Sequence, residues 1–331
     1  MKRLFLPILL SILVFNSFQL FAQGLKFDKD GNFKIVQFTD LHYKSGVEES
    51  KKALECIENV LGEEEPDFII ITGDLVYSTP AEKALYELME PVIASGIPYA
   101  IVWGNHDSDF DLTREQIRII SEKLKGNLSR TEKGVSGESN FVLTVKSYAG
   151  DKDAAILYCL DSHSYSQMKP LVSGYAWFED DQIDWYKAKR DAFIKQNDGK
   201  VLPSMAFFHI ALPEYNQAAA DENTILYGNR WEAACAPKLN TGMFKAMLEK
   251  GDVMATFVGH DHDNDYVCNW YGMILGYGRF SGGNTEYHHL PINGARVIVL
   301  QEGSNDFESW IRLRDGQKIL QFKKSQLLKR D

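Results

Sequence analysis

Short apolar runs recur along the chain, and most are followed by segments in which apolar residues return every three or four positions. The run Asp67–Thr72 is apolar almost throughout, which is typical of a strand buried on both faces. Leu54, Ile57 and Leu61 recur instead at helical spacing. Apolar runs of the first kind predict strands at Asn32–Thr39, Asp67–Thr72, Tyr99–Trp103, Phe141–Val145, Ala154–Leu160, Val201–Phe208, Val253–Val258, Trp270–Leu275, Ala295–Leu300 and Glu308–Leu313.

Helix starts are marked by capping signals. Thr79-Pro80-Ala81-Glu82 has the form of a capping box with proline at the first helical position, and Thr113 with Gln116 forms another. Further helices are predicted at Glu179–Ile194 and Met243–Lys250. Strands that alternate with helices predict parallel βαβ units. No linker divides the chain, so residues 23–331 are predicted to form a single α/β domain with a β-rich second half.

The first 22 residues have the pattern of a secretory signal peptide. Lys2 and Arg3 form a basic start, residues 4–20 are almost wholly apolar, and Ala22 offers a small residue for cleavage. A retained membrane anchor is the alternative for this segment. No cysteine stands at the junction, so a lipoprotein anchor has no attachment point. Cleavage would give a secreted or periplasmic protein without stable membrane association.

Composition and charge narrow the function classes. Among 331 residues 44% are hydrophobic and 25% charged, as in ordinary globular proteins. The formal net charge of −10 disfavours a general nucleic-acid binder, because an acidic surface repels phosphate backbones. Export would permit disulfides. Cys56 and Cys159 fit as buried residues, which leaves Cys235 and Cys268, both in loop-like segments, as the predicted disulfide.

Chemistry-bearing residues follow five of the predicted strands directly. Open α/β sheets place their sites at these carboxyl ends, and carboxylate, amide oxygen and imidazole are together ligands for divalent transition metals. Each motif alone has an ordinary structural explanation, such as a turn or a hydrogen-bonded histidine. Their joint order favours a metal site built from Asp40-Leu41-His42, Gly73-Asp74, Gly104-Asn105-His106-Asp107, Phe208-His209 and Gly259-His260-Asp261-His262.

This ordered set resembles the pattern of the calcineurin-like metallophosphoesterases, in particular the branch related to purple acid phosphatases. The resemblance covers roughly Phe33 to Leu300. It implies a sandwich of two mixed β-sheets flanked by helices, a four-layer α/β/β/α fold, with the site on loops at one edge. It also implies two metal ions, from iron, zinc or manganese.

The family pattern assigns a role to each matching residue. Asp40, His42 and His262 would hold the first metal, Asn105, His209 and His260 the second, and Asp74 would bridge the two. His106 would face the substrate without binding metal, next to Asn105. In purple acid phosphatases a tyrosine three residues after the bridging aspartate binds ferric iron. Tyr77 stands there in this chain, but His42 competes for the same metal, so Tyr77 is predicted to line the pocket.

Two metals about 3.5–4 Å apart polarise a phosphoryl oxygen and lower the pKa of a bridging water. The sequence therefore predicts a phosphatase, in which a metal-bridging hydroxide attacks small phosphate monoesters. Asp74 and His106 are the predicted catalytic residues, with His106 as proton donor to the leaving group. Asp107 is expected to orient a neighbouring imidazole, and Arg279 is a candidate phosphate contact beside Asn105 and His106.

Two alternatives stay open. One is a phosphodiesterase acting on nucleotides, nucleotide-sugars or glycerophosphodiesters with the same metal core. The other is a catalytically silent metal-bound binding protein, against which the intact His106 argues. No protein partner is implied.

Overall fold

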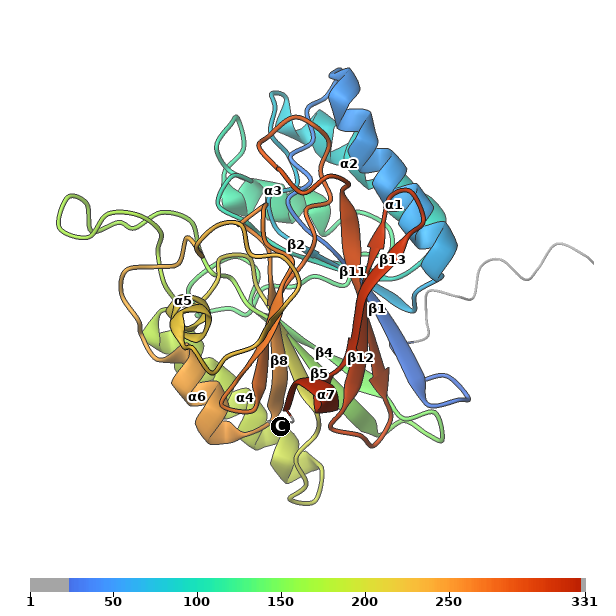
Figure 1. Cartoon of the computed structure of the whole chain (residues 1–331), viewed down its shortest axis with the longest axis vertical. Helices are drawn as coiled ribbons and strands as arrows, with labels where there is room; N and C mark the ends of the chain where they lie inside the picture. Colours follow the sequence, from blue (N-terminus) through green and yellow to red (C-terminus); the bar gives the residue numbers. More distant parts are fainter. Residues whose placement is uncertain (1–23, 329–331) are drawn as a thin grey trace, which may run out of the picture.

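Two mixed β-sheets stack face to face, and helices cover the outer face of each (Figure 1). The computed structural model describes residues 24–328. One sheet has six strands in the order β13 (Lys318–Lys323), β12 (Phe307–Leu313), β11 (Gly294–Gln301), β1 (Asn32–Phe38), β2 (Phe68–Thr72) and β3 (Tyr99–Val102). The other has seven, in the order β4 (Phe141–Lys146), β5 (Asp153–Cys159), β6 (Ser204–Phe207), β8 (Val253–Val258), β10 (Met273–Tyr277), β9 (Val267–Trp270) and β7 (Leu226–Tyr227).

The helices divide between the two outer faces. On the six-stranded sheet lie α1 (Lys51–Glu64), α2 (Ala81–Ser95) and α3 (Arg114–Ser121). On the seven-stranded sheet lie α4 (Asp180–Gln196), α5 (Pro213–Ala220) and α6 (Met243–Lys250). The short η2 (Glu48–Ser50) precedes α1, and α7 (Lys324–Leu328) follows β13. The predicted four-layer architecture is confirmed.

Three apolar clusters hold the layers together. In β2, Phe68 and Ile70 face the opposite sheet, whereas Ile69 and Ile71 face the helices, so all five residues of the strand are buried. This explains the unbroken apolar run of its sequence. Phe207 and Phe257 contribute to the inter-sheet cluster from the other side, with ring centroids 6.0 Å apart. Tight packing on both faces leaves the strand ends as the place for polar side chains.

Parallel pairing brings the strand ends to one edge. Strands β1, β2 and β3 are mutually parallel, and so are β5, β6, β8 and β10. Parallel strands place all their carboxyl ends on the same side, so the loops that follow them meet there. Thr39, just after β1, forms a β-bridge with Phe280 from the segment that follows β10, which joins the two sheets at this edge.

Of the two predicted capping boxes, one is confirmed and one is wrong. The Thr113 capping box is confirmed, because its side chain accepts the Gln116 N–H and the Gln116 side chain accepts the Thr113 N–H. The box at Thr79 is wrong, because Pro80 is itself the N-cap of α2 and has no side-chain acceptor; Asp111 Oδ1 accepts the Ala81 N–H instead. The strand predicted at Trp270–Leu275 is a hairpin, in which β9 and β10 are joined at Tyr271 and Gly272.

The predicted Cys235–Cys268 disulfide is not formed. Cys235 is exposed in a loop, whereas Cys268 is buried within β9, a strand and not the loop that was expected. Cys56 and Cys159 are buried free thiols, as predicted. Among residues 24–328 no helix is both long and apolar enough to cross a membrane. The predicted signal peptide lies outside the described residues.

Candidate metal centre

Seven predicted ligands converge where the two sheets meet. Four follow strands of the six-stranded sheet and three follow strands of the seven-stranded sheet. All seven side chains are buried, although none lies inside a regular strand or helix. In chain order they are Asp40 and His42 after β1, Asp74 after β2, Asn105 after β3, His209 after β6, and His260 and His262 after β8.

The first group consists of Asp40, His42 and His262, whose ligand atoms lie within 4.8 Å of one another. The two imidazole Nε2 atoms are 3.1 Å apart, and His262 Nε2 is 3.7 Å from Asp40 Oδ1. A carboxylate and two imidazoles at this spacing suit a transition-metal ion.

The second group consists of Asp74, His209 and His260, again within 4.8 Å. Asn105 joins it, because its Oδ1 lies 3.2 Å from His209 Nε2. Asp74 Oδ2 is 3.2 Å from His209 Nε2 and 3.6 Å from His42 Nε2 in the first group. One carboxylate oxygen therefore touches both groups, which is the arrangement predicted for a bridging ligand.

Unpartnered buried atoms fit a pair of cations. Asp74 Oδ2 and His260 Nε2 are buried and have no hydrogen-bond partner among the described residues. Buried polar atoms are normally hydrogen-bonded, so each unpaired atom needs an explanation. Four imidazoles, two carboxylates and an amide oxygen pointing inward provide a ligand set that zinc, manganese and iron all accept.

Backbone carbonyls orient two of the imidazoles. His209 Nδ1 donates to the carbonyl oxygen of Thr72 and His262 Nδ1 to that of Tyr287, both at 2.7 Å. A carbonyl only accepts, so Nδ1 carries the hydrogen and Nε2 turns toward the centre. Such outer hydrogen bonds are typical of metal-binding histidines.

Electrostatics within the centre follow from burial and close charges. Burial lowers the pKa of His42 and His260 well below the usual value, which keeps both imidazoles neutral. Burial opposes charge on Asp74 too, but His209, His42 and His106 outweigh it and hold the Asp74 pKa well below its usual value. Burial likewise disfavours charge on His209, and Asp74 overcomes it and raises the His209 pKa to about 9. A cation bound here would take the place of the proton between them.

The ligand loops are held in an uncommon backbone conformation. Asp40, His42, Asp74 and His260 have φ values of 53°, 41°, 53° and 76°. For residues with a side chain such conformations cost roughly 1 to 3 kcal/mol each and cluster at functional sites. They persist only where the surroundings hold them in place.

Asp107 provides part of that support. Its carboxylate accepts the backbone N–H groups of Leu75 at 2.7 Å, Gly104 at 2.8 Å and Asp74 at 3.0 Å. The expectation that Asp107 orients an imidazole is therefore wrong, because it ties the loop after β2 to the loop after β3. Gly104 is required between them, since a Cβ there would lie 2.1 Å from Asp74 Oδ1.

His106 stands apart from both ligand groups. Its backbone N–H donates to Asp74 Oδ1 at 2.8 Å, while its side chain is 28% exposed and Nδ1 lies 2.5 Å from Asp109 Oδ2. The ring is thus accessible beside the centre, and its substrate-facing role stays a prediction. Asp109 was not predicted, although its place three residues after His106 could have suggested the pair.

Two further residues were assigned from sequence. The ring of Tyr77 packs edge-on against His42 and His106, with centroids 5.2 and 5.3 Å apart, as a pocket-lining residue would. Arg279 is not a phosphate contact. Its side chain is buried, with Nη1 2.6 Å from Asp265 Oδ2 and Nε 3.0 Å from the carbonyl oxygen of Ile292.

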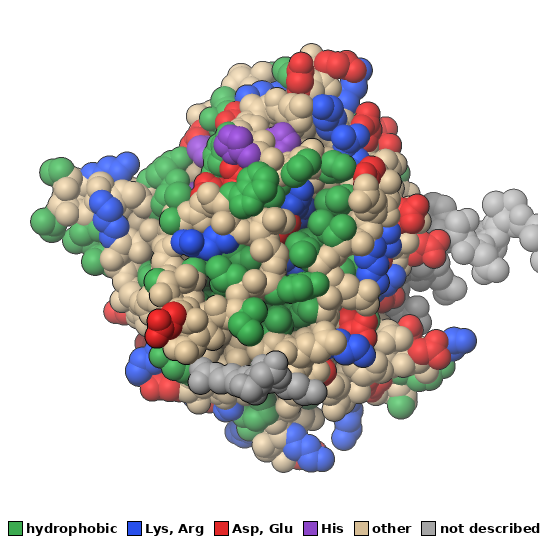
Figure 2. All heavy atoms as spheres, in the orientation of Figure 1, with side chains coloured by type: hydrophobic (Ala, Val, Ile, Leu, Met, Phe, Trp, Pro, Cys, Tyr) green, Lys and Arg blue, Asp and Glu red, His purple; other side chains and the backbone are tan. Residues whose placement is uncertain are grey.

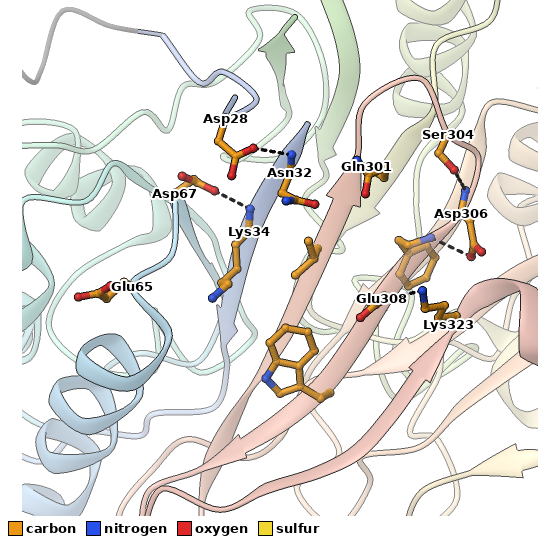
Figure 3. Close-up of a pocket in the computed structure, with 13 residues that line it drawn as sticks. Asp28, Asn32, Lys34, Glu65, Asp67, Gln301, Ser304, Asp306, Glu308 and Lys323 are labelled. Atoms are coloured by element: carbon orange, nitrogen blue, oxygen red, sulfur yellow. Dashed lines mark hydrogen bonds and ion pairs between the residues drawn. The ribbon is translucent and has the colours of Figure 1, made fainter. Parts of the chain in front are cut away.

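A separate hollow lies at the opposite end of the same strands (Figure 3). It measures about 630 Å³ and includes Asn32 and Lys34 at the start of β1. None of the 13 described residues that line it is a histidine or cysteine. Five of them are acidic and two are lysines, so the net charge of the lining disfavours phosphate. Histidine side chains gather instead at the upper end of the molecule in Figure 2.

The sequence model described as "Calcineurin-like phosphoesterase" matches residues 33–264, more than half of the chain. The chain belongs to the calcineurin-like phosphoesterase family. The matched segment contains every ligand of the calcineurin-like centre, from Asp40 to His262.

Similar proteins differ in whether their names describe them as active enzymes. The chain is 31% identical to "Probable inactive purple acid phosphatase 29" of Arabidopsis thaliana, over 86% of this chain and 81% of that protein. It is 32% identical to "Phosphatase DCR2" of Saccharomyces cerevisiae, over 90% of this chain but only 56% of that protein. A dimetal phosphatase from Danio rerio has a similar fold, with a TM-score of 0.59, 13% identity, and coverage of 88% and 98% of the two chains.

Proposed function

We propose that the protein is an exported phosphatase that hydrolyses small phosphate monoesters at a two-metal centre. One observation carries the proposal, namely that Asp74 Oδ2 lies between two buried ligand groups, 3.2 Å from His209 Nε2 and 3.6 Å from His42 Nε2. When bound, two cations from iron, zinc or manganese would supply Lewis-acid stabilisation to the phosphoryl group and to the attacking water. Export rests on the signal-like first 22 residues.

The chain's own residues provide the remaining functions. Asn105 contributes a neutral oxygen, which leaves the centre cationic enough to attract a phosphate dianion. His106 gives its proton to the leaving oxygen. Asp109 Oδ2 lies 2.5 Å from His106 Nδ1 and so fixes the ring with Nε2 on the side away from Asp109. Tyr77 packs against the His106 ring and limits its rotation.

The complete set of ligand residues and the presence of His106 favour an enzyme over a catalytically silent binding protein. The Arabidopsis relative carries the word "inactive" in its name, whereas the yeast relative is named a phosphatase. In this chain all seven ligands converge and His106 remains exposed beside them. These features support turnover.

Activity toward two chromogenic esters tests the proposal. The protein, loaded with manganese, zinc or iron in turn, is assayed with p-nitrophenyl phosphate and with bis(p-nitrophenyl) phosphate. We expect faster hydrolysis of the monoester and complete loss on chelation. Metal binding without turnover of either ester would contradict the proposal and favour a binding protein.

A diesterase is the second candidate. A relative named "Probable cyclic nucleotide phosphodiesterase" from Psychrobacter arcticus is 37% identical over 92 residues, which cover 24% of this chain. Faster hydrolysis of the diester than of the monoester would favour this candidate, since the metal ligands suit both reactions.

A further inference from the structure

The loop of residues 164–176 reaches the candidate metal centre at its base. It projects from the body of the molecule (Figure 1), and Leu171 near its tip is 82% exposed. At the base Tyr165 and Tyr175 form an antiparallel bridge, and their rings stack with centroids 5.7 Å apart. Ser166 N–H donates to the Gly174 carbonyl oxygen at 2.9 Å, so the base is ordered by its own backbone.

Tyr165 contacts a ligand of the second group directly. The Asn105 Nδ2 group donates to the Tyr165 hydroxyl oxygen at 3.3 Å, while Asn105 Oδ1 faces His209 Nε2. Ser164 Oγ donates to the Asn105 backbone carbonyl at 3.2 Å, a second contact from the same loop. The loop therefore fixes the amide of Asn105 with its oxygen toward the centre.

This contact leaves the phenolic hydrogen of Tyr165 available. An amide N–H₂ only donates, so the hydroxyl oxygen must accept, and its own hydrogen points elsewhere. Among the described residues no acceptor takes that hydrogen. The Tyr165 ring lies 6.4 Å from the His106 ring, so the free donor stands beside the predicted proton donor.

Building on the proposed function, we propose that the Tyr165 hydroxyl donates a hydrogen bond to a non-bridging oxygen of the substrate's phosphoryl group. A phosphate dianion only accepts hydrogen bonds, and bonds to charged acceptors are short and strong. A donor held in place by the Asn105 contact and the Tyr175 stack needs little reorganisation when charge builds up on the phosphoryl oxygens. The loop of residues 164–176 is thereby part of the substrate site.

The Tyr165→Phe variant tests this role, because it keeps the stacked ring and removes only the hydroxyl. The manganese-loaded protein is assayed with p-nitrophenyl phosphate, and inorganic phosphate binding is measured by calorimetry. We expect kcat/KM to fall about 10- to 100-fold, since hydrogen bonds to charged groups contribute at that level. Phosphate affinity is expected to fall about 10-fold for the same reason, with two metals per chain retained.

Tyr175→Phe is the matched control. It removes a hydroxyl from the same stacked pair, but one that Asn105 does not contact. We expect clearly smaller losses of kcat/KM and of phosphate affinity than in Tyr165→Phe, because the Tyr175 ring that stacks on Tyr165 and packs against His260 is kept. Equal losses in both variants would overturn the proposal, because they would point to the packing of the loop.

Two other outcomes separate this inference from the proposed function. If Tyr165→Phe loses metal and excess manganese restores activity, the hydroxyl only positions Asn105 and the inference is wrong, although the phosphatase stands. If the unmodified protein binds phosphate through Tyr165 but hydrolyses no ester, the inference stands and the proposed function fails. Absence of phosphate binding in the loaded protein would overturn both.

Discussion

Strands β1 and β2 carry polar side chains at both ends, and the two ends differ in how those side chains are satisfied. At the carboxyl ends, where the loop after β8 joins them, Asp74 Oδ2 and His260 Nε2 are buried without hydrogen-bond partners, and the backbone of four ligands lies at positive φ. At the amino ends lies the 630 Å³ hollow. There Asp67 Oδ2 accepts the Lys34 N–H at 2.7 Å, and Lys323 pairs with Glu308 at 2.6 Å (Figure 3).

The comparison shows that the volume of a cavity and its capacity to bind a ligand are different properties. The hollow is large, but its aspartates accept backbone N–H groups and Lys323 pairs with Glu308, so it has little to gain from a ligand. The candidate metal centre is buried, and polar atoms in it have no hydrogen-bond partner. Burying such atoms costs folding free energy unless a bound ligand satisfies them. Two unsatisfied buried atoms of metal-ligand type within one group, Asp74 Oδ2 and His260 Nε2, mark the site on this fold, and volume does not.

Loss of Asp74 is expected to have the largest effect at the carboxyl ends. Asp74→Ala removes the one carboxylate that touches both ligand groups, so both cations should bind more weakly. Because metal-ion stabilisation supplies several kcal/mol, we expect kcat/KM to fall by about 10³-fold or more. Metal content and kinetics beside His42→Ala check this. An Asp74→Ala protein with both metals and most of its turnover would contradict the bridging role.

The second-largest effect is expected at His106. His106→Ala removes the proposed proton donor but none of the seven proposed metal ligands, so metal content should equal that of the unmodified protein. General acid catalysis is worth typically about 10²- to 10⁴-fold and matters most for poor leaving groups. The loss should accordingly be larger on alkyl phosphates than on p-nitrophenyl phosphate. Equal losses on the two substrates would mean that His106 only positions the phosphate.

A stability measurement compares ion pairs at the two ends. Near the centre, Arg114 Nη2 lies 2.6 Å from Asp161 Oδ1, whose side chain is fully buried, and Arg114 also donates to the Gly104 carbonyl oxygen. Arg114→Ala leaves the Asp161 charge buried and unpaired, which should lower the free energy of unfolding by about 3 kcal/mol. Chemical denaturation measures this. A loss below about 1 kcal/mol, as for an exposed pair, would contradict the comparison.

The same pair predicts a pH dependence. Burial disfavours charge on Asp161, but Arg114 outweighs it and lowers the Asp161 pKa to about 2. Because the pKa is lower in the folded state than the usual value near 4, the pair stabilises the fold fully above pH 4. That contribution should be lost as the pH falls from about 4 to about 2. Unfolding curves of Asp161→Asn should lack this part of the acid sensitivity.

The smallest effect is expected in the hollow. The side chains of Lys323 and Glu308 are 55% and 36% exposed, and exposed pairs are worth about 0–1 kcal/mol. Lys323→Ala should change the free energy of unfolding by less than about 1 kcal/mol, and kcat/KM should not change. A clear loss of activity would show that the hollow is coupled to catalysis and would break the comparison.

The metal ligands could be predicted because each follows an apolar strand within two to four residues, so local order is enough to place them. Supporting contacts are not local in this way. Asn105 and Tyr165 are 60 residues apart, and Asp107 accepts N–H groups from residues 31 to 33 positions earlier. No spacing rule indicates such contacts.

Two wrong predictions have similar physical causes. Arg279 follows a strand near the site, but whether it faces the substrate depends on Asp265, which pairs with it inside the protein. The β9–β10 hairpin was missed because its turn places Tyr271 at φ 51°, where glycine or asparagine is usual. In both cases tertiary packing outweighs the local signal.

Because its ligands are divided between the two sheets, the centre forms only when both sheets have folded and packed together. Asp40, His42, Asp74 and Asn105 come from the first third of the chain, whereas His209, His260 and His262 arrive with the second sheet. Neither half can assemble either group alone, because each group mixes ligands from both sheets. Cations held by these two groups would bind the finished fold in preference to the unfolded chain and would stabilise the packing of the sheets by mass action. The metal content of a sample therefore measures the fraction of molecules in which the two sheets are correctly packed.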